Sequence, residues 1–291
     1  PSYRQNTQRT FLWGVLMTGA YGVLQYLIAP EWDKFWLINV KATAFGTPEP
    51  FGIRVFSTMN SPQPFSLVMM TGLLLLFNSK GSLRFPASGV GYLSFLLTLA
   101  RAAWLGWSVG LLTLLNSLKA RLQMRLIITI LIMALFVIPL ATIEPFSGVI
   151  SSRLQTLSST QNDVSYQARS EGYGELFGLA LSELLGKGVG HVINSDSLGS
   201  NDSGILTLLF SLGWLGTIPY LGGLILLLFS VFQSSEGRFD PFMSAARAIS
   251  LGVFVQLGLG SVMLGLIGVL LWGFLGMAMA AHKYYQHQHN T

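Results

Sequence analysis

Two polar positions stand out in this apolar chain, because their residue types could do chemistry at a membrane. Arg101 interrupts an otherwise apolar stretch from Val90 to Leu118, and Asn201-Asp202-Ser203 opens another membrane-length apolar run. An ionisable group at the edge of hydrocarbon costs several kcal/mol unless something compensates it, so it is by default a candidate for handling a charged substrate. These positions therefore predict a site for a charged substrate, and the rest of the chain is expected to hold them in place.

The elements expected to hold these residues are transmembrane helices. Hydrophobic residues make up 51% of the 291 residues and charged residues 10%, with a mean hydropathy of +0.56. Soluble domains carry about 25% charged residues. Continuous apolar runs come close to the roughly 20 residues that cross a bilayer as a helix. The sequence thus predicts an all-α, polytopic transmembrane helix bundle that forms a single membrane domain over residues 1–291. The absence of cysteine excludes disulfides and thiol chemistry.

The apolar runs predict about eight spans, and one boundary decides the topology. Splitting the stretch around Arg101 gives two spans, whereas one span with a central arginine would reverse everything downstream. The predicted spans are Phe11 to Ala29, Phe65 to Asn78, Ala87 to Leu99, Ala103 to Leu118, Leu126 to Ile143, Ile205 to Phe232, Ala245 to Leu259 and Val262 to His282.

Charge counting favours the split. With it, one side of the membrane holds ten basic and two acidic residues, a net charge of +8, and the other holds seven basic and ten acidic residues, a net charge of −3, which together give the chain's +5. Loops rich in lysine and arginine favour the cytoplasmic side. Both termini are therefore predicted to be cytoplasmic and the long loops to lie outside. The basic isoelectric point reflects this topology, so no nucleic-acid partner is expected.

Two predicted outer loops are too long to be simple connections, residues 30–64 and 144–202, and long loops in compact proteins usually carry function. The second contains an amphipathic pattern that predicts a helix over about residues 165–185, ending at Gly186. We expect this helix to lie with its apolar face on the membrane or on the bundle. Arg169 falls on that face, so its side chain is expected to point into the protein.

Two motifs carry a resemblance to a known family. Arg101-Ala-Ala-Trp-Leu105 follows the pattern Arg-x-x-x-Leu at the outer end of a span. Asp202-Ser203 is followed after nine residues by Gly213-Trp-Leu-Gly216. This resembles the O-antigen ligases and the related polysaccharide polymerases, with aspartate in place of the ligases' histidine. The substitution weakens an assignment to lipid A ligation and favours a polymerase or another branch.

Two further segments resemble the same family more weakly. Gly52-Ile-Arg54-Val-Phe-Ser57 with Pro62 resembles the family's first-loop motif, and Arg169 followed by Gly188-Val-Gly190 resembles its loop arginine and Gly-x-Gly. The resemblance covers roughly residues 50–282. Family members typically have more spans, so we expect N-terminal helices to be missing before Pro1.

The resemblance implies a metal-independent glycosyltransferase, without a cofactor, at the outer face of the bacterial inner membrane. It would transfer a glycan from an undecaprenyl-pyrophosphate-type carrier to a sugar hydroxyl. Arginines clamp phosphate oxygens bidentately, so Arg101, Arg169 and Arg54 are expected to hold the pyrophosphate. Asp202 is the candidate general base. His191 and Asp196, in the same loop, could supply a second proton site. The expected partners are the lipid-linked donor, the glycan acceptor and membrane lipids.

Each of these residues also has a structural interpretation. Asp202 could cap its helix, Arg101 could extend to the lipid interface, and Arg54 could pair with Glu49 or bind a lipid phosphate. Trp32 and other aromatic residues fit an interfacial belt, although they would also suit sugar rings. For the whole chain, the alternatives are a flippase or transporter of lipid-linked glycans and an assembly subunit.

Overall fold

The computed structural model describes residues 2–40, 45–117, 120, 123–124, 127–128, 131, 176–188, 203–233, 240–263 and 265–290. Over these residues the fold is all-α, as predicted, apart from one isolated antiparallel bridge between Gly46 and Ile53. A short helix covers residues 176–182. The other helices are α1 (Ser2–Ile28), α2 (Glu31–Val40), α3 (Pro62–Leu76), α4 (Arg84–Leu97), α5 (Arg101–Ser117), α9 (Gly204–Gln233), α10 (Pro241–Phe254), the 3₁₀ turn η3 (Val255–Gly258) and α11 (Gly265–Asn290).

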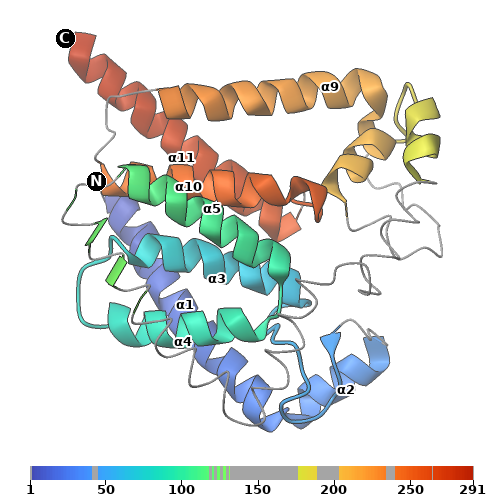
Figure 1. Cartoon of the computed structure of the whole chain (residues 1–291), viewed down its shortest axis with the longest axis vertical. Coiled ribbons are helices and arrows are strands. Elements are labelled where there is room, and N and C mark those ends of the chain that lie inside the picture. Colours follow the sequence, from blue (N-terminus) through green and yellow to red (C-terminus); the bar gives the residue numbers. More distant parts are fainter. Residues whose placement is uncertain are drawn as a thin grey trace.

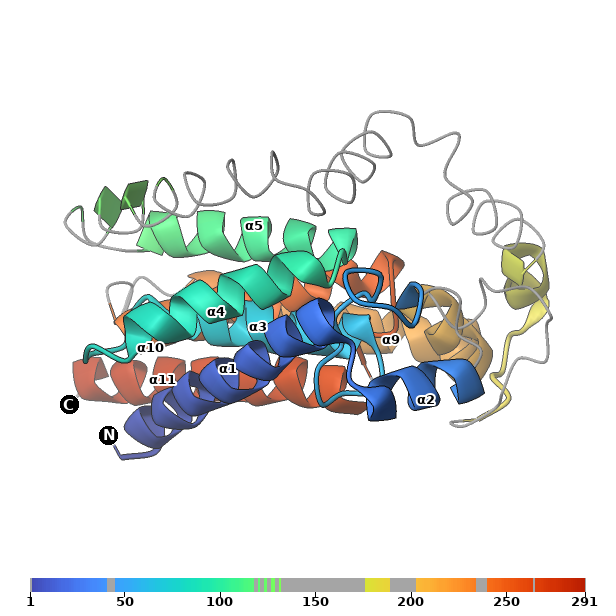
Figure 2. The same ribbon diagram turned by 90° about the horizontal axis from the view of Figure 1, so that it is seen from below.

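The bundle is built around α10, which packs against α5, α11 and α3, while α1 packs on α3 and α4. Figures 1 and 2 both place the N- and C-termini at the same end of the bundle, which we call the terminal end. The opposite end, called the loop end, carries α2, residues 45–61, the α4–α5 junction and the start of α9 (Figure 1). Every predicted outer element that the structure describes is therefore at the loop end.

Small residues set the close crossing of α5 and α10. An added Cβ at Gly106 would overlap the Gly252 carbonyl, and one at Gly252 would overlap the Gly106 carbonyl. A Cβ at Gly110 would lie 3.0 Å from the Ala248 oxygen. Small residues let membrane helices approach closely and gain van der Waals contact where lipid supplies no hydrophobic driving force. Almost all of α10 is buried as a result.

Seven of the eight predicted spans fall on described helices, and Leu126 to Ile143 lies mostly outside the described residues. By length and composition, α1, α9 and α11 are the described helices that could cross a membrane. α3 is apolar but shorter. The structure is thus that of a helical membrane protein, and the total of about eight spans stays a prediction.

The predicted interruption at Arg101 is confirmed, because α4 ends at Leu97 and α5 begins at Arg101. The two helices run in opposite directions, and α3 packs against both of them (Figure 1). The sequence predicted a long loop over residues 30–64 and named no helix in it, whereas the structure has α2 there. This helix has a recognisable start, since Pro30 precedes a first turn that contains Glu31 and Asp33.

The predicted continuous span Ile205 to Phe232 is wrong in one respect, because α9 breaks at Gly213 (φ 64°, ψ −176°). Residues 183–188 form hydrogen bonds with four backbone groups of α9 that have no helical partner at the break. The N–H groups of Lys187 and Gly188 donate to the Phe210 and Ser211 carbonyls, at 2.7 and 3.0 Å. In return, the Trp214 and Leu215 N–H groups donate to the Glu183 and Leu184 carbonyls, both at 3.3 Å. Residues 183–188 therefore form a plug in the helix break.

The amphipathic helix of the second long loop is described only over residues 176–182, so the predicted end at Gly186 is four residues too late. Its backbone leaves the helix earlier because residues 183–188 bond to α9 instead. Leu176 and Ala180 are buried against a cluster on α9, which confirms that part of the apolar face lies on the bundle. The α9 residues of this cluster are Leu206, Leu209, Phe210 and, partly buried, Trp214.

Candidate functional site

Of the predicted site residues, Arg54 and Arg101 lie within the described part of the chain, both at the loop end. The other predicted residues are outside the described residues: Arg169, His191, Asp196 and Asp202. The structure therefore describes two of the three predicted arginines and the helix start that follows Asp202.

Arg54 binds the α4–α5 junction. Its Nε donates to the Thr98 carbonyl at 3.1 Å, and its Nη2 donates to the Leu99 carbonyl at 3.3 Å. The last carbonyls of a helix have no partner within the helix and carry partial negative charge, which a guanidinium complements. Arg54 thus holds the backbone that leads into Arg101. This contact adds a positioning role that none of the three sequence interpretations of Arg54 included.

The junction itself is strained and closely bonded. Leu99 has a left-handed backbone (φ 53°), which is costly for a side chain branched at Cγ. The Val55 N–H donates to the Leu97 carbonyl at 3.1 Å, so residues 54–55 bond three successive carbonyls at the end of α4. Such strain persists where the surrounding structure enforces it, and it clusters at functional sites. Arg101, half-buried, is the first residue of α5 after this turn.

The start of α9 lies at the same end of the bundle. The Gly204 N–H donates to the Gly260 carbonyl at 3.1 Å. The Gln63 side chain packs on Gly260, because a Cβ added there would overlap the Gln63 amide. Gln63 is the second residue of α3, the helix that follows the loop with Arg54. The start of α9 and the start of α3 therefore both contact Gly260.

Ser203 occupies the N-cap position of α9, since its Oγ accepts from the Leu206 N–H at 3.4 Å. Ser203 is buried, and its carbonyl also accepts from the Thr207 N–H and hydroxyl. A single residue normally occupies this position in a helix. Ser203 thus caps α9, while Asp202, for which the sequence left a capping role open, lies outside the described residues.

An aromatic pocket of about 440 Å³ opens at the loop end between α1, α2 and the loop after Arg54. Among its lining residues, Asp33 is 7% exposed and Trp32 is 65% exposed. The Tyr21 hydroxyl donates to the Asp33 carboxylate at 2.8 Å and accepts from the Trp32 indole N–H. The full lining is Tyr21, Trp32, Asp33, Trp36, Phe56, Ser57, Thr58, Met59 and Asn60.

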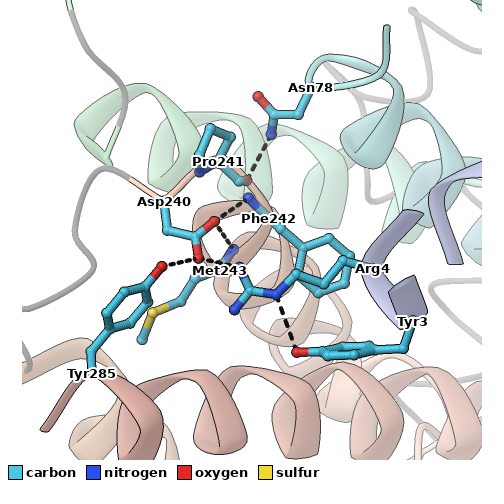
Figure 3. Close-up of polar contacts among 8 residues, drawn as sticks. All are labelled: Tyr3, Arg4, Asn78, Asp240, Pro241, Phe242, Met243 and Tyr285. Carbon is cyan, nitrogen blue, oxygen red and sulfur yellow. Dashed lines mark hydrogen bonds and ion pairs between the residues drawn. The ribbon is translucent and has the colours of Figure 1, made fainter. Parts of the chain in front are cut away.

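A second polar cluster, which the sequence reasoning missed, lies at the terminal end around Asp240 (Figure 3). Its Oδ2 accepts from Arg4 Nη1 at 2.6 Å and from the Tyr285 hydroxyl at 2.8 Å, while Oδ1 accepts from the Phe242 N–H at 2.9 Å. The Asn78 amide donates to the Pro241 carbonyl at 2.8 Å. The sequence signal was Asp followed by Pro, a common start of a helix.

Arg247 lies inside the predicted span Ala245 to Leu259, and the charge count assigned it to the cytoplasmic side. It is in the second turn of α10 and is 3% exposed. Its electrostatic environment includes Asp240, the N-cap residue about two helical turns earlier. The Arg247 side chain thus lies in the bundle interior near the terminal end, whereas Arg54 and Arg101 lie at the loop end.

No protein-family model, no curated protein and no solved structure matches this chain.

Proposed function

We propose that this chain is an integral membrane glycosyltransferase that moves a glycan from an undecaprenyl-pyrophosphate-type carrier to a sugar hydroxyl, in polysaccharide polymerisation or ligation, at the outer face of a bacterial inner membrane. One observation carries the proposal. Arg101 begins α5 at a junction that Arg54 holds. At the same end of the bundle, α9 begins after its N-cap Ser203 and contacts Gly260, on which Gln63 of α3 packs. The motif that contains Asp202 leads directly into this helix start.

The proposed reaction assigns one task to each group. Arg101 and Arg169 bind the diphosphate and stabilise the negative charge that develops as the bond between the anomeric carbon and the diphosphate oxygen breaks. The acceptor oxygen forms the new glycosidic bond, and its proton passes to the Asp202 carboxylate. The polyprenyl diphosphate leaves with the bonding electron pair. Arg54 positions the junction and adds its charge to the field of the site.

The direct test is transfer of labelled glycan from a lipid-linked oligosaccharide to an acceptor by the protein reconstituted in liposomes. We expect Arg101→Ala, Arg169→Ala and Asp202→Asn each to lower the rate by about 100-fold or more, the effect of removing one group that stabilises a transition state. Arg84→Ala is the matched control, because Arg84 begins α4 at the terminal end as Arg101 begins α5 at the loop end. Unchanged transfer in all three site variants would refute the assignment.

The same liposomes test the flippase alternative, which the break in α9 brings into consideration. Transporters use discontinuous helices whose open ends bind ions or substrates. Here residues 183–188 bond four of the backbone groups that the break frees, so these groups are already satisfied. This favours transfer over ion-coupled transport. Movement of labelled lipid between leaflets without glycan transfer would support the flippase, and neither activity would support an assembly subunit.

A further inference from the structure

We infer that the aromatic pocket between α1, α2 and residues 56–60 is a saccharide subsite, which binds a sugar ring of the glycan that is transferred or extended. This inference rests on the proposed function for its biological meaning. Its physical basis is separate, because it depends on a pocket whose residues took no part in the argument for the reaction. A volume of about 440 Å³ is within the range of small-molecule sites.

The aromatic side chains of the pocket suit the apolar face of a pyranose ring. Trp32 is 65% exposed on α2, so its indole is accessible to a ligand. Trp36 is held in place, since it stacks on Phe45 with 5.9 Å between ring centroids and an interplanar angle of 4° and also contacts Phe56 at 5.1 Å. The pocket thus offers one open and one fixed indole.

The polar side chains suit sugar hydroxyls. The Asp33 carboxylate is oriented by the Tyr21 hydroxyl, which in turn accepts from Trp32. None of the ion pairs among the described residues includes Asp33, although it is 7% exposed. A buried carboxylate needs hydrogen-bond donors, and sugar hydroxyls supply strong ones. Thr58 and Asn60, exposed at the rim, can both donate and accept.

The floor of the pocket is preorganised. Ser57 adopts a left-handed backbone (φ 53°), and buried Gln25 of α1 holds it there. The Gln25 Oε1 accepts from the Phe56 and Ser57 N–H groups at 3.0 and 2.9 Å, and the Ser57 hydroxyl donates to the Thr18 carbonyl at 2.7 Å. A site that is already formed loses less entropy when a ligand binds.

The position of the pocket favours a sugar that is part of the substrate. Arg54, which binds the α4–α5 junction, stands two residues before Phe56 in the same segment. The segment that holds the α4–α5 junction therefore also supplies part of the pocket lining. Aromatic residues with a carboxylate can also bind a quaternary ammonium. That ligand is disfavoured here, because Phe45 covers one face of Trp36 and the rim carries an amide and a hydroxyl.

The test is saturation-transfer NMR of the full chain in detergent micelles with methyl pyranosides of glucose, galactose, mannose, rhamnose and N-acetylglucosamine. We expect at least one glycoside to bind, and Trp32→Ala and Asp33→Asn each to weaken its binding about tenfold or more. The matched controls are Phe35→Ala and Glu31→Gln, exposed residues of α2 that do not line the pocket. Thr58→Ala, at the exposed rim, should weaken binding without affecting folding.

The inference is overturned if no glycoside binds, if the controls weaken binding as much as the pocket variants, or if tetramethylammonium binds in place of the glycosides. Failure of the subsite and failure of the proposed function are distinguishable. Glycan transfer by a protein that binds no glycoside would remove the subsite alone. Glycoside binding that depends on Trp32 and Asp33, in a protein that transfers no glycan, would support the subsite and refute the transferase.

Discussion

Asp240 and Arg54 each compensate the partial charge at a helix terminus, and they do so at opposite ends of the bundle. Asp240 places an anion at the N-terminus of α10, where free N–H groups carry partial positive charge, and Arg54 places a cation at the C-terminal carbonyls of α4. Asp240 does more than cap, because its second oxygen joins α10 to Arg4 of α1 and Tyr285 of α11 (Figure 3). One polar residue thus bonds a helix terminus at each end of the bundle.

Two substitutions at Asp240 should separate its roles. Asparagine caps helices about as well as aspartate, so Asp240→Asn should lose mainly the ion pair with Arg4, a cost of about 1 kcal/mol. Asp240→Ala also removes the cap, for a total cost of about 2 kcal/mol. The measurement is the midpoint of thermal unfolding in micelles, with the order wild type, Asp240→Asn, Asp240→Ala. Equal midpoints for the two variants would show that the cap contributes nothing.

At the scale of elements, the plug of residues 183–188 in the break of α9 depends on two glycines. An added Cβ at Gly186 would overlap the Ser211 backbone, and one at Gly213 would overlap the Leu184 carbonyl and the Gly186 nitrogen. Gly213 also needs a left-handed φ of 64°. Backbone approaches backbone here, so no side chain can move aside to make room.

Gly213→Ala should therefore loosen the plug. Alanine at φ 64° and ψ −176°, a backbone region that essentially only glycine adopts, costs about 1–3 kcal/mol before any overlap is counted. Limited proteolysis should cut within residues 183–188 at least about tenfold faster than in the wild type. The control is Gly222→Ala in the same helix, where an added Cβ meets nothing within 4 Å, and its cleavage rate should not increase. Equal rates for wild type and Gly213→Ala would contradict the account of the break.

These elements show what the sequence could predict. The apolar runs located seven described helices, and the charge of Arg101 located the junction of α4 and α5, because burial of apolar residues and exclusion of charge are local properties. The break at Gly213 was not predictable in this way, since it depends on hydrogen bonds to a segment about 25 residues earlier in the chain. The pocket was missed for a related reason, because α2 was read as loop.

At the scale of the whole molecule, the two groups of residues that the charge count assigned to opposite sides of the membrane lie towards opposite ends of the bundle. The described residues predicted to be cytoplasmic lie towards the terminal end, with the two termini, and those predicted to be outside lie towards the loop end (Figures 1 and 2). Arg101, the start of α9 and the aromatic pocket share the loop end. A reaction on a lipid-linked glycan therefore needs this one end to face the compartment that holds the acceptor.

Cysteine labelling in intact cells tests this orientation, and the chain is suited to it because it contains no cysteine of its own. Lysine and arginine concentrate in cytoplasmic loops, so the terminal end should face the cytoplasm. A membrane-impermeant maleimide should label Glu49→Cys, exposed at the loop end, in intact cells. Ser82→Cys and Gln286→Cys, exposed at the terminal end, should be labelled only after permeabilisation. The reverse pattern would place the loop end in the cytoplasm, where the proposed site could not meet an acceptor outside.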